Sequence, residues 1–378
     1  MSKPRFLQIH TLHSYTAALL NRDDSGLAKR LAYGGAIRTR ISSQCLKRHW
    51  RMADTDPHAL GTLAGFVESF RSRELVTKKI IDPLREQFPV EVLAELEPEF
   101  QKAVYGDKAD KGKKNRQTLL LGEPELVWLA AEAERLAGEA ENAESAKKLA
   151  TEWGKSFKDN IKVLRENTLL PGGVSAALFG RMVTSDPAAN IDAPVHVGHA
   201  FTVHAEESEG DYFTAVDDLR IESEDSGADT IQETELTSGI FYGYVVVDLP
   251  GLIRNCGGDR QLAAKIIHNL IYLVAEVSPG AKLGSTAPYG RADLMLAEVG
   301  DRQPRSLAAA WRKPVAPDLD EAIAALSHHL GKLDEVYATG EERACFSMCD
   351  SVLPGSAPQS LANLAEWAEQ KLEAAPDA

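Results

Sequence analysis

The chain has 378 residues, 44% of them hydrophobic and 26% charged, and a formal net charge of −14 at pH 7. This length and composition indicate a folded protein of one elaborated domain or two, and they exclude an intrinsically disordered chain. No run of about 18 or more apolar residues is present and residues 1–10 lack the apolar stretch of a secretory signal, so no membrane span is predicted and a cytoplasmic location is expected.

The charge is unevenly distributed along the chain. Residues 1–51 hold ten Lys or Arg residues and two acidic residues, a balance of +8, so the remaining residues carry −22. A protein that binds a polyanion needs a basic surface even when its average charge is negative. The N-terminal segment therefore predicts one polyanion-binding surface on an otherwise acidic protein, with a basic segment that is merely solvated as the alternative.

The first predicted elements are a strand and a helix. Residues 6–13 predict a strand, and a stretch containing Gly and Asp follows at 21–35. A helix is predicted over 42–53, with Ser42 or Ser43 as the N-cap. Helical spacing gives this segment an apolar face of Cys45, Leu46, His49 and Trp50 and a polar face of Gln44, Lys47, Arg48 and Arg51.

The rest of the chain predicts an inserted helical region and more strands. Residues 54–193 have helical periodicity, interrupted by a basic loop at 106–116. Strands are predicted at 195–204 and 238–249, and the polar segment 205–237 between them is expected to be a projecting, mobile hairpin. A helix at 260–277 and a strand at 292–299 follow, and residues 300–378 add helical segments.

This order of elements predicts a fold class. With the insertion set aside, strand, helix, strand, strand, helix and strand give the order βαββαβ. That is the order of the ferredoxin-like, RRM-type α+β fold, which commonly binds single-stranded RNA. The predicted divisions are 1–53, 194–204 and 238–378 for the sheet and its helices, 54–193 for the helical insertion and 205–237 for the hairpin.

The polar face of the 42–53 helix is the strongest candidate site. Three cations and an amide lie on one side, and Ser42, Ser43 and the first backbone N–H groups lie at the positive end of the helix, where phosphates bind well. Arg38 and Arg40 precede the helix and, if extended, project on one side to lengthen the cationic track. No acidic residue at i,i+4 accompanies the cations of the helix.

Two apolar residues are candidates to wedge between bases. Met182 and Phe213 could stack against a nucleobase, a contact worth about 1–3 kcal/mol per base that tolerates any sequence. Core positions are the alternative for both.

Catalytic and metal sites have weaker support. His196 and His204 share one face of a strand while His199 points to the other, so strand positions explain them better than a metal site. Cys345 and Cys349 have helical spacing but no neighbouring partners for zinc. Asp23 and Asp24 could bind a divalent ion, although no third ligand is evident. Neither a phosphate-binding loop nor a nucleophile elbow is present, so no enzyme activity, metal or cofactor is expected.

Several motifs resemble the CasC family, the backbone subunit of type I-E Cascade. They are Leu20 to Asp24, Gly34–Gly35, Arg40 to Arg48, Gly180 to Ser185, Phe213 to Asp218, Ser238 to Tyr242 and Pro279 to Lys282, in the family's order across about residues 5–300. The resemblance implies an RRM-like palm, helical fingers inserted after the first helix, and a β-hairpin thumb. It also implies a non-catalytic, CRISPR RNA-binding subunit that polymerises along the guide RNA and presents it for pairing with invading DNA in antiviral defence.

The resemblance also implies roles for particular residues and partners. The residues expected to hold the RNA backbone are Arg22, Arg38, Arg40, Ser42, Ser43, Gln44, Lys47, Arg48 and Arg51. Those expected at the displaced base are Met182, Phe213 and Thr214. Lys147, Lys148, Lys155 and Lys158 resemble only loosely a lysine-bearing helix that contacts duplex DNA in the family. The implied partners are CRISPR RNA, target DNA through the guide, further copies of the chain and the other Cascade subunits, with no membrane.

Two other functions remain open at this point. Backbone subunits of type III complexes are similar in fold and cut target RNA with a loop aspartate, which would nominate Asp23 or Asp24 in this chain. A stand-alone protein that binds single-stranded RNA outside CRISPR systems is the other alternative.

Overall fold

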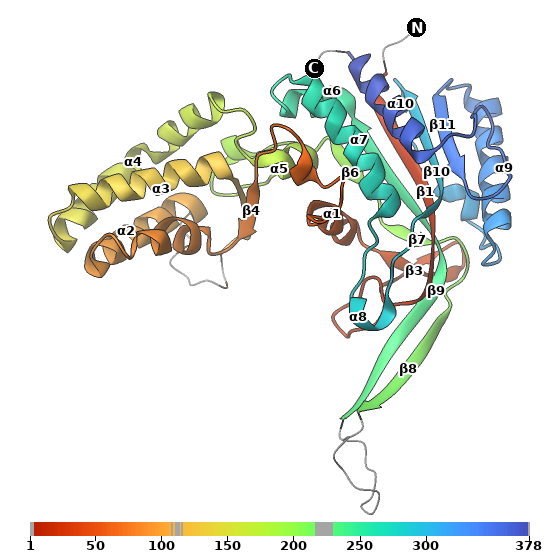
Figure 1. Ribbon diagram of the computed structural model, residues 1–378, viewed down its shortest axis with the longest axis horizontal. Helices are drawn as coiled ribbons and strands as arrows, with labels where there is room; N and C mark the ends of the chain where they lie inside the picture. Colours follow the sequence, from red (N-terminus) through yellow and green to blue (C-terminus); the bar gives the residue numbers. More distant parts are fainter. Residues whose placement is uncertain (1–3, 107–108, 110–113, 115, 216–229, 377–378) are drawn as a thin grey trace, which may run out of the picture. The chain divides into compact units, whose positions relative to one another are not determined.

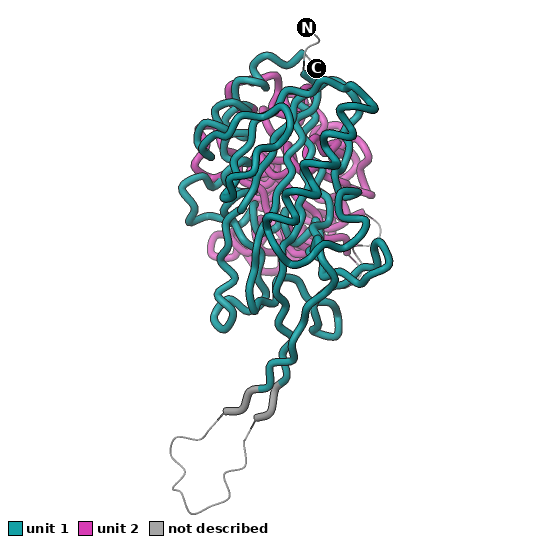
Figure 2. Tube along the Cα trace, turned by 90° about the vertical axis from the view of Figure 1, so that its right-hand side faces the viewer, with its two compact units in different colours: residues 1–59, 196–249, 264–376 teal, residues 60–195, 250–263, 377–378 magenta. Residues whose placement is uncertain are grey.

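The computed structural model describes residues 4–106, 109, 114, 116–215 and 230–376. The chain divides into two compact units, coloured separately in Figure 2. The sheet unit comprises residues 1–59, 196–249 and 264–376. The helical unit comprises residues 60–195 and 250–263, together with 377–378.

An antiparallel sheet forms the centre of the sheet unit. Its strand order is β11-β10-β1-β9-β7-β3-β2 (Figure 1). The strands are β1 (Phe6–Ala18), β2 (Arg30–Tyr33), β3 (Ala36–Ile41), β7 (Ala200–Thr202), β9 (Thr230–Asp248), β10 (Ala292–Gly300) and β11 (Glu342–Ser347). The predicted α+β class is confirmed, and the sheet is antiparallel.

Strand β1 lies between β9 and β10 and is buried on both faces. Leu12 pairs with Tyr242 of β9 on one side and with Leu294 of β10 on the other. On one face of the sheet these three side chains share a core with Trp311 and Leu326. Because both faces of β1 are covered, the polar Gln8 and His10 are buried as well as the apolar Leu7 and Ile9.

Helices cover both faces of this sheet. The core that contains Trp311 and Leu326 includes residues of η7 (Ala308–Trp311) and α9 (Leu319–Tyr337). On the other face, Leu46 and Trp50 of α1 (Ser43–Arg51) and Val274 of α7 (Arg260–Glu276) line a small cavity with Phe241 of β9. The sheet therefore fixes the position of α1, the helix with the candidate basic face.

A long hairpin projects from the sheet. Strand β8 (Ser208–Ala215) pairs antiparallel with residues 230–237 of β9, and the ladder extends away from the rest of the sheet (Figure 1). The sequence predicted that this strand of the sheet begins at 238. It begins at 230 because pairing with β8 extends it.

The helical unit has a separate core. Phe100 of α2 (Val90–Tyr105) stacks on Trp153 of α4 (Ala143–Glu166) with ring centroids 4.0 Å apart. Leu129 of α3 (Glu123–Glu139) and Phe157 of α4 are buried in the same cluster. The cap of α4 is reciprocal, since Asn142 Oδ1 accepts from the Ser145 N–H and Ser145 Oγ accepts from the Asn142 N–H, each at 3.0 Å.

Shorter elements complete the described structure. In the helical unit they are η1 (Leu60–Thr62), β4 (Ser69–Ser72), η2 (Val76–Ile81), η3 (Asp82–Leu84), β5 (Leu119–Gly122), α5 (Gly173–Phe179), η6 (Pro187–Ala189) and all but the first residue of α6 (Leu249–Asn255). In the sheet unit they are α8 (Leu283–Thr286) and α10 (Leu361–Glu373). The short strand β6 (Val195–Val197) pairs with β9 of the sheet. Within the described residues, no helix is both long and apolar enough to cross a membrane.

The strand predicted over 195–204 is two short strands in the structure. β6 ends at Val197 and β7 begins at Ala200. Between them, the Gly198 N–H donates to the Tyr244 carbonyl of β9 at 2.8 Å. Strand β11 was not predicted, because residues 342–347 were assigned to a helical C-terminal region.

Candidate nucleic-acid interface

Helix α1 begins at a side-chain cap that the sequence predicted. Ser42 has extended backbone angles, and its Oγ accepts the Cys45 N–H at 3.3 Å, which confirms Ser42 as the N-cap. Leu46 and Trp50 are buried against the sheet unit. Burial of this face directs the opposite face outward, where Gln44 and Arg48 are exposed and Lys47, Arg51 and Ser43 are partly exposed.

The loop at 21–29 lies against the N-terminus of this helix. Asn21 Oδ1 accepts the Ser42 N–H at 2.9 Å, and the Asn21 carbonyl accepts the Lys29 N–H at 2.9 Å. Arg22 is exposed, and its backbone forms a bridge with Ala28. These contacts bring Arg22 and Lys29 to the end of α1 at which phosphates bind best.

Asp23 organises this loop. Its Oδ1 accepts the Ser25 N–H at 2.9 Å and the Leu27 N–H at 3.1 Å. This bonding is typical of an aspartate that fixes a turn. The other acidic residue of the loop, Asp24, is exposed.

Arg40 of β3 extends the basic surface. Its Nε donates to the Arg30 carbonyl at 3.1 Å, and its Nη1 donates to His199 Nδ1 at 3.1 Å. Burial lowers the pKa of His199, and the charges of Arg40 and Lys29 lower it further. His199 is therefore neutral near pH 7 and accepts a hydrogen bond from Arg40, while Lys29 and Arg40 supply the positive charge.

Arg38 does not join this surface, in contrast to the expectation from its spacing to Arg40. Its side chain is fully buried, and its guanidinium donates to the carbonyls of Thr202, His204 and Trp311 at 2.8, 3.3 and 2.9 Å. Burial lowers the pKa of Arg38. Arg38 therefore ties β3 to the segments at 202–204 and 311, and it is inaccessible to a phosphate.

Lys29, His199 and Lys282 also belong to this surface, although none of them was predicted to bind RNA. The Gly280 N–H donates to His49 Nε2 at 3.4 Å, which brings the loop 278–282 to α1. Lys282 Nζ donates to Thr234 Oγ1 at the base of the hairpin. Lys29 and Lys282 could have been found from the sequence, since Lys29 is in the basic segment and Lys282 is in a matched motif. His199 was considered only as a metal ligand, and nothing in the sequence indicated its contact with Arg40.

Met182 lies in the helical unit and is 71% exposed, which is contrary to a core position. Arg181 and Val183 on either side are buried. Arg181 Nη1 contacts Glu125 Oε2 at 2.6 Å, and Gln117 Nε2 donates to the Met182 carbonyl at 3.0 Å. The backbone around Met182 is thus held firmly while its side chain projects.

Phe213 and Thr214 lie in β8. Their backbones pair with Gln232 and Ile231 of β9. Their side chains lie outside the described residues. The neighbouring Tyr212 is 62% exposed.

The other two histidines considered as metal ligands, His196 and His204, have different surroundings. His204 Nε2 accepts the Ile240 N–H at 3.1 Å, and burial lowers the pKa of His204. His196 is exposed. No group of three or more His, Cys, Asp or Glu side chains suited to a metal ion occurs in the part of the chain that the structure describes.

Comparison with known proteins supplies the family. One solved chain, from a structure titled "CRISPR RNA-guided surveillance complex, pre-nicking", is 26% identical, with a TM-score of 0.78 over 97% of this chain and 100% of that chain. A second, from a "CRISPR RNA-guided surveillance complex", has the same fold at 22% identity, with a TM-score of 0.60 over 97% of this chain and 99% of that chain. No curated protein sequence matches the chain. The family model described as CT1975-like protein matches residues 7–370, and the chain therefore belongs to the CT1975-like protein family.

Proposed function

We propose that this chain is a CRISPR RNA-binding backbone subunit of a type I-E Cascade surveillance complex in the cytoplasm. Several copies line up along one guide RNA and present it for pairing with invading DNA, in company with the other Cascade subunits. The observation that carries the proposal is the basic face of α1, with Arg22 and Arg40 beside it. The similarity to a chain of an RNA-guided surveillance complex supports the same function.

The basic surface suits the phosphates of a single strand. Arg48 is exposed on α1, Lys47 and Arg51 are partly exposed, and Ser42 and Ser43 lie at the helix N-terminus. Cations and a helix N-terminus bind phosphates without reading the bases. Such binding suits a subunit that must accept any guide sequence, because specificity then comes from the guide itself.

We also propose counterparts in this chain for the parts of the family's hand-like shape. In this proposal the sheet unit is the RRM-like palm, the helical unit supplies the fingers, and the β8/β9 hairpin is the thumb. Met182 is the wedge that the helical unit contributes, and Phe213 with Thr214 is the wedge of the thumb. The exposure of Met182 on a firmly held backbone supports this role, since a wedge must resist the base that it displaces.

We also propose that the chain cuts no RNA itself. The similarity to type III subunits nominates two loop aspartates, of which Asp23 already accepts two backbone N–H groups within its turn and Asp24 is exposed. A cleavage assay on the guide-bound complex with Mg²⁺ and a complementary RNA tests this proposal. Product that forms with the wild-type chain and disappears in an Asp23→Ala variant would establish the enzyme instead.

Co-purification tests the binding function. The chain is expressed with a CRISPR array and the other complex subunits, purified by a tag on this chain, and its nucleic acid is sized and sequenced. We expect RNA of uniform length that carries the array's guide sequences, in a particle that holds several copies of the chain. A monomer without RNA would contradict the proposal and favour a stand-alone protein.

A further inference from the structure

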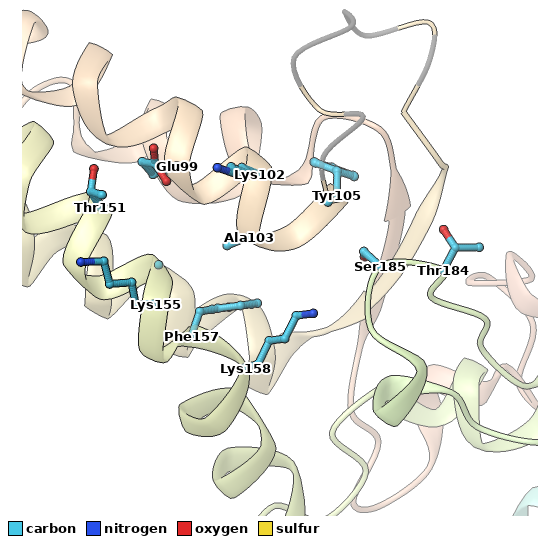
Figure 3. A pocket seen from close by; sticks show the side chains of 12 residues that line it. Glu99, Lys102, Ala103, Tyr105, Thr151, Lys155, Phe157, Lys158, Thr184 and Ser185 are labelled. Carbon is cyan, nitrogen blue, oxygen red and sulfur yellow. The ribbon is translucent and has the colours of Figure 1, made fainter.

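The helical unit contains a large cavity with a basic lining. It has a volume of about 840 Å³ and lies between α2 and α4, with Thr184 and Ser185 at its rim. Lys102 of α2 lies on one wall, and Lys155 and Lys158 of α4 lie on the facing helix (Figure 3). The other charged lining residue among those described is Glu99. The lining therefore carries a net positive charge.

The three lysines of this cavity form no ion pair with a described carboxylate. Their neighbours on α4 differ, since Lys148 pairs with Glu144 at 2.9 Å and Lys147 pairs with Glu95 at 3.6 Å. Ammonium groups that have no ion pair of their own attract the approach of an anionic group. The cavity thus suits a ligand that carries several negative charges.

The β8 strand of the hairpin carries the opposite charge. Glu209 and Asp211 lie two positions apart in β8, so they point to the same face and stand about 7 Å apart, and Glu207 directly precedes the strand. All three are exposed, and none forms an ion pair with a described residue. Glu206 and Glu235 at the hairpin base differ, since both pair with Arg30. We call Glu207, Glu209 and Asp211 the carboxylate row.

We propose that the lysine cavity of one copy of this chain receives the carboxylate row of the next copy. The proposal rests on the proposed function, which places copies side by side along RNA. One observation favours a second copy over a nucleic acid as the occupant. Each copy has a net charge of −14, so neighbouring copies repel unless acidic and basic surfaces meet.

The geometry of such a contact also suits a filament. The cavity and the row are different surfaces, so the contact is head-to-tail, and a joined pair keeps one free row at one end and one free cavity at the other. A head-to-tail contact that does not close into a ring repeats along a filament. Because the groups are solvent-accessible, the contact is weak individually and sensitive to salt.

Charge reversal in both partners tests the proposal. Two RNA lengths are used, one that binds a single copy and one that binds several. The affinity gain is the ratio of the affinity for the longer RNA to the affinity for the shorter RNA. The double variant Lys155→Glu with Lys158→Glu should lower this gain by about tenfold at low salt and leave the affinity for the shorter RNA unchanged. Glu209→Lys with Asp211→Lys should do the same. A chain with all four reversals should recover most of the gain, because the complementary charges are restored.

A control pair lies on the same helix. Lys147→Glu with Lys148→Glu changes the charge of α4 by the same amount at residues outside the cavity lining, and it should leave the affinity gain unchanged. The proposal is overturned if this pair has the same effect as the cavity pair, or if the four reversals together are no better than each pair alone. The proposal is also overturned if Lys155→Glu with Lys158→Glu weakens binding to the shorter RNA or to duplex DNA, because the cavity would then bind phosphates.

Cross-linking separates this proposal from the proposed function. Isotope-labelled and unlabelled copies are mixed at low salt, with and without RNA, and treated with a carbodiimide, which joins a lysine amine to a carboxylate as an amide with loss of water. Cross-links from Lys155 or Lys158 to Glu209 or Asp211 between labelled and unlabelled chains are expected. If they form in a chain that never binds RNA, the contact stands and the RNA function fails. If the cross-links join only residues of the same copy, or do not form, the proposed contact between copies is contradicted.

Discussion

The side chain of Asn21 accepts the Ser42 N–H at 2.9 Å, and this bond fastens the loop that carries Arg22 to the start of α1. One amide therefore joins two basic segments of the chain. Asn21→Ala should lower the free energy of unfolding by about 1 kcal/mol and weaken RNA binding, although no charge is removed. Denaturant unfolding and RNA titration measure the two effects. Ser25→Ala on the same loop is the control, and equal RNA affinities in the two variants would argue against this role of Asn21.

Removal of an exposed cation from α1 should weaken RNA binding without regard to sequence. For a single strand, removing one phosphate interaction lowers the slope of log affinity against log salt by about 0.7. Arg48→Ala is expected to have this effect on RNAs of unrelated sequence. Lys332→Ala on α9, where the lysine pairs with Glu335, should leave the slope unchanged. A slope for Arg48→Ala that equals the wild-type slope would remove Arg48 from the interface.

Substitution of Arg38 should mainly lower stability, whereas substitution of Arg40 should mainly weaken RNA binding. Arg38→Ala removes the guanidinium donor from the Thr202 and Trp311 carbonyls, whereas the His204 carbonyl keeps the Thr202 hydroxyl, so we expect a loss of about 3 kcal/mol in the free energy of unfolding. Arg40→Ala should cost little stability and should lower the salt slope of RNA binding instead. Urea unfolding and RNA titration of both variants check this, and an Arg38→Ala chain of wild-type stability would contradict it.

The stability of the sheet unit should fall in mild acid. Burial lowers the pKa of His13 to about 4, against partial opposition from Asp293. An unfolded histidine has a pKa of about 6.5, so the unfolded chain binds more protons below that pH. Stability contributed by His13 is therefore complete above pH 6.5 and falls by up to about 3 kcal/mol as the pH drops to 4. His13→Gln should flatten this part of the profile, and an unchanged profile would refute the assignment.

Met182 should affect base geometry more than affinity. Met182→Ala removes a projecting side chain but no charge, so phosphate contacts and the salt slope should persist. A fluorescent base analogue placed in turn along the guide should lose its periodic signal of an unstacked base in this variant. Leu169→Ala, also exposed in the helical unit, is the control. An unchanged fluorescence pattern with Met182→Ala would remove Met182 from the wedge.

The elements that were predicted correctly are those in which the local sequence pattern matches the burial of the side chains in the structure. Ser42 precedes a segment in which Leu46 and Trp50 lie one turn apart, and the structure has the same cap and the same buried face. The strand at 6–13 continues to Ala18 as β1. In both cases the local pattern and the tertiary environment favour the same conformation.

The elements that were missed depend on contacts between distant residues. Strands β2 and β3 contain Arg30, Arg38 and Arg40, and a basic segment of this kind predicts an exposed surface. Nothing near Arg38 in the sequence identifies the carbonyls of residues 202, 204 and 311, which accept hydrogen bonds from its guanidinium. The exposure of Met182 likewise depends on Gln117 and Glu125, which are distant in the chain.

The number of copies on guide RNAs of different length tests the central claim most directly. Complexes are assembled on guides whose spacer is lengthened in steps, and native mass spectrometry counts the copies of this chain in each particle. If the chain is the repeating backbone subunit, the number of copies rises in steps with guide length while the other subunits stay constant. A copy number that stays the same for every guide length would contradict the account.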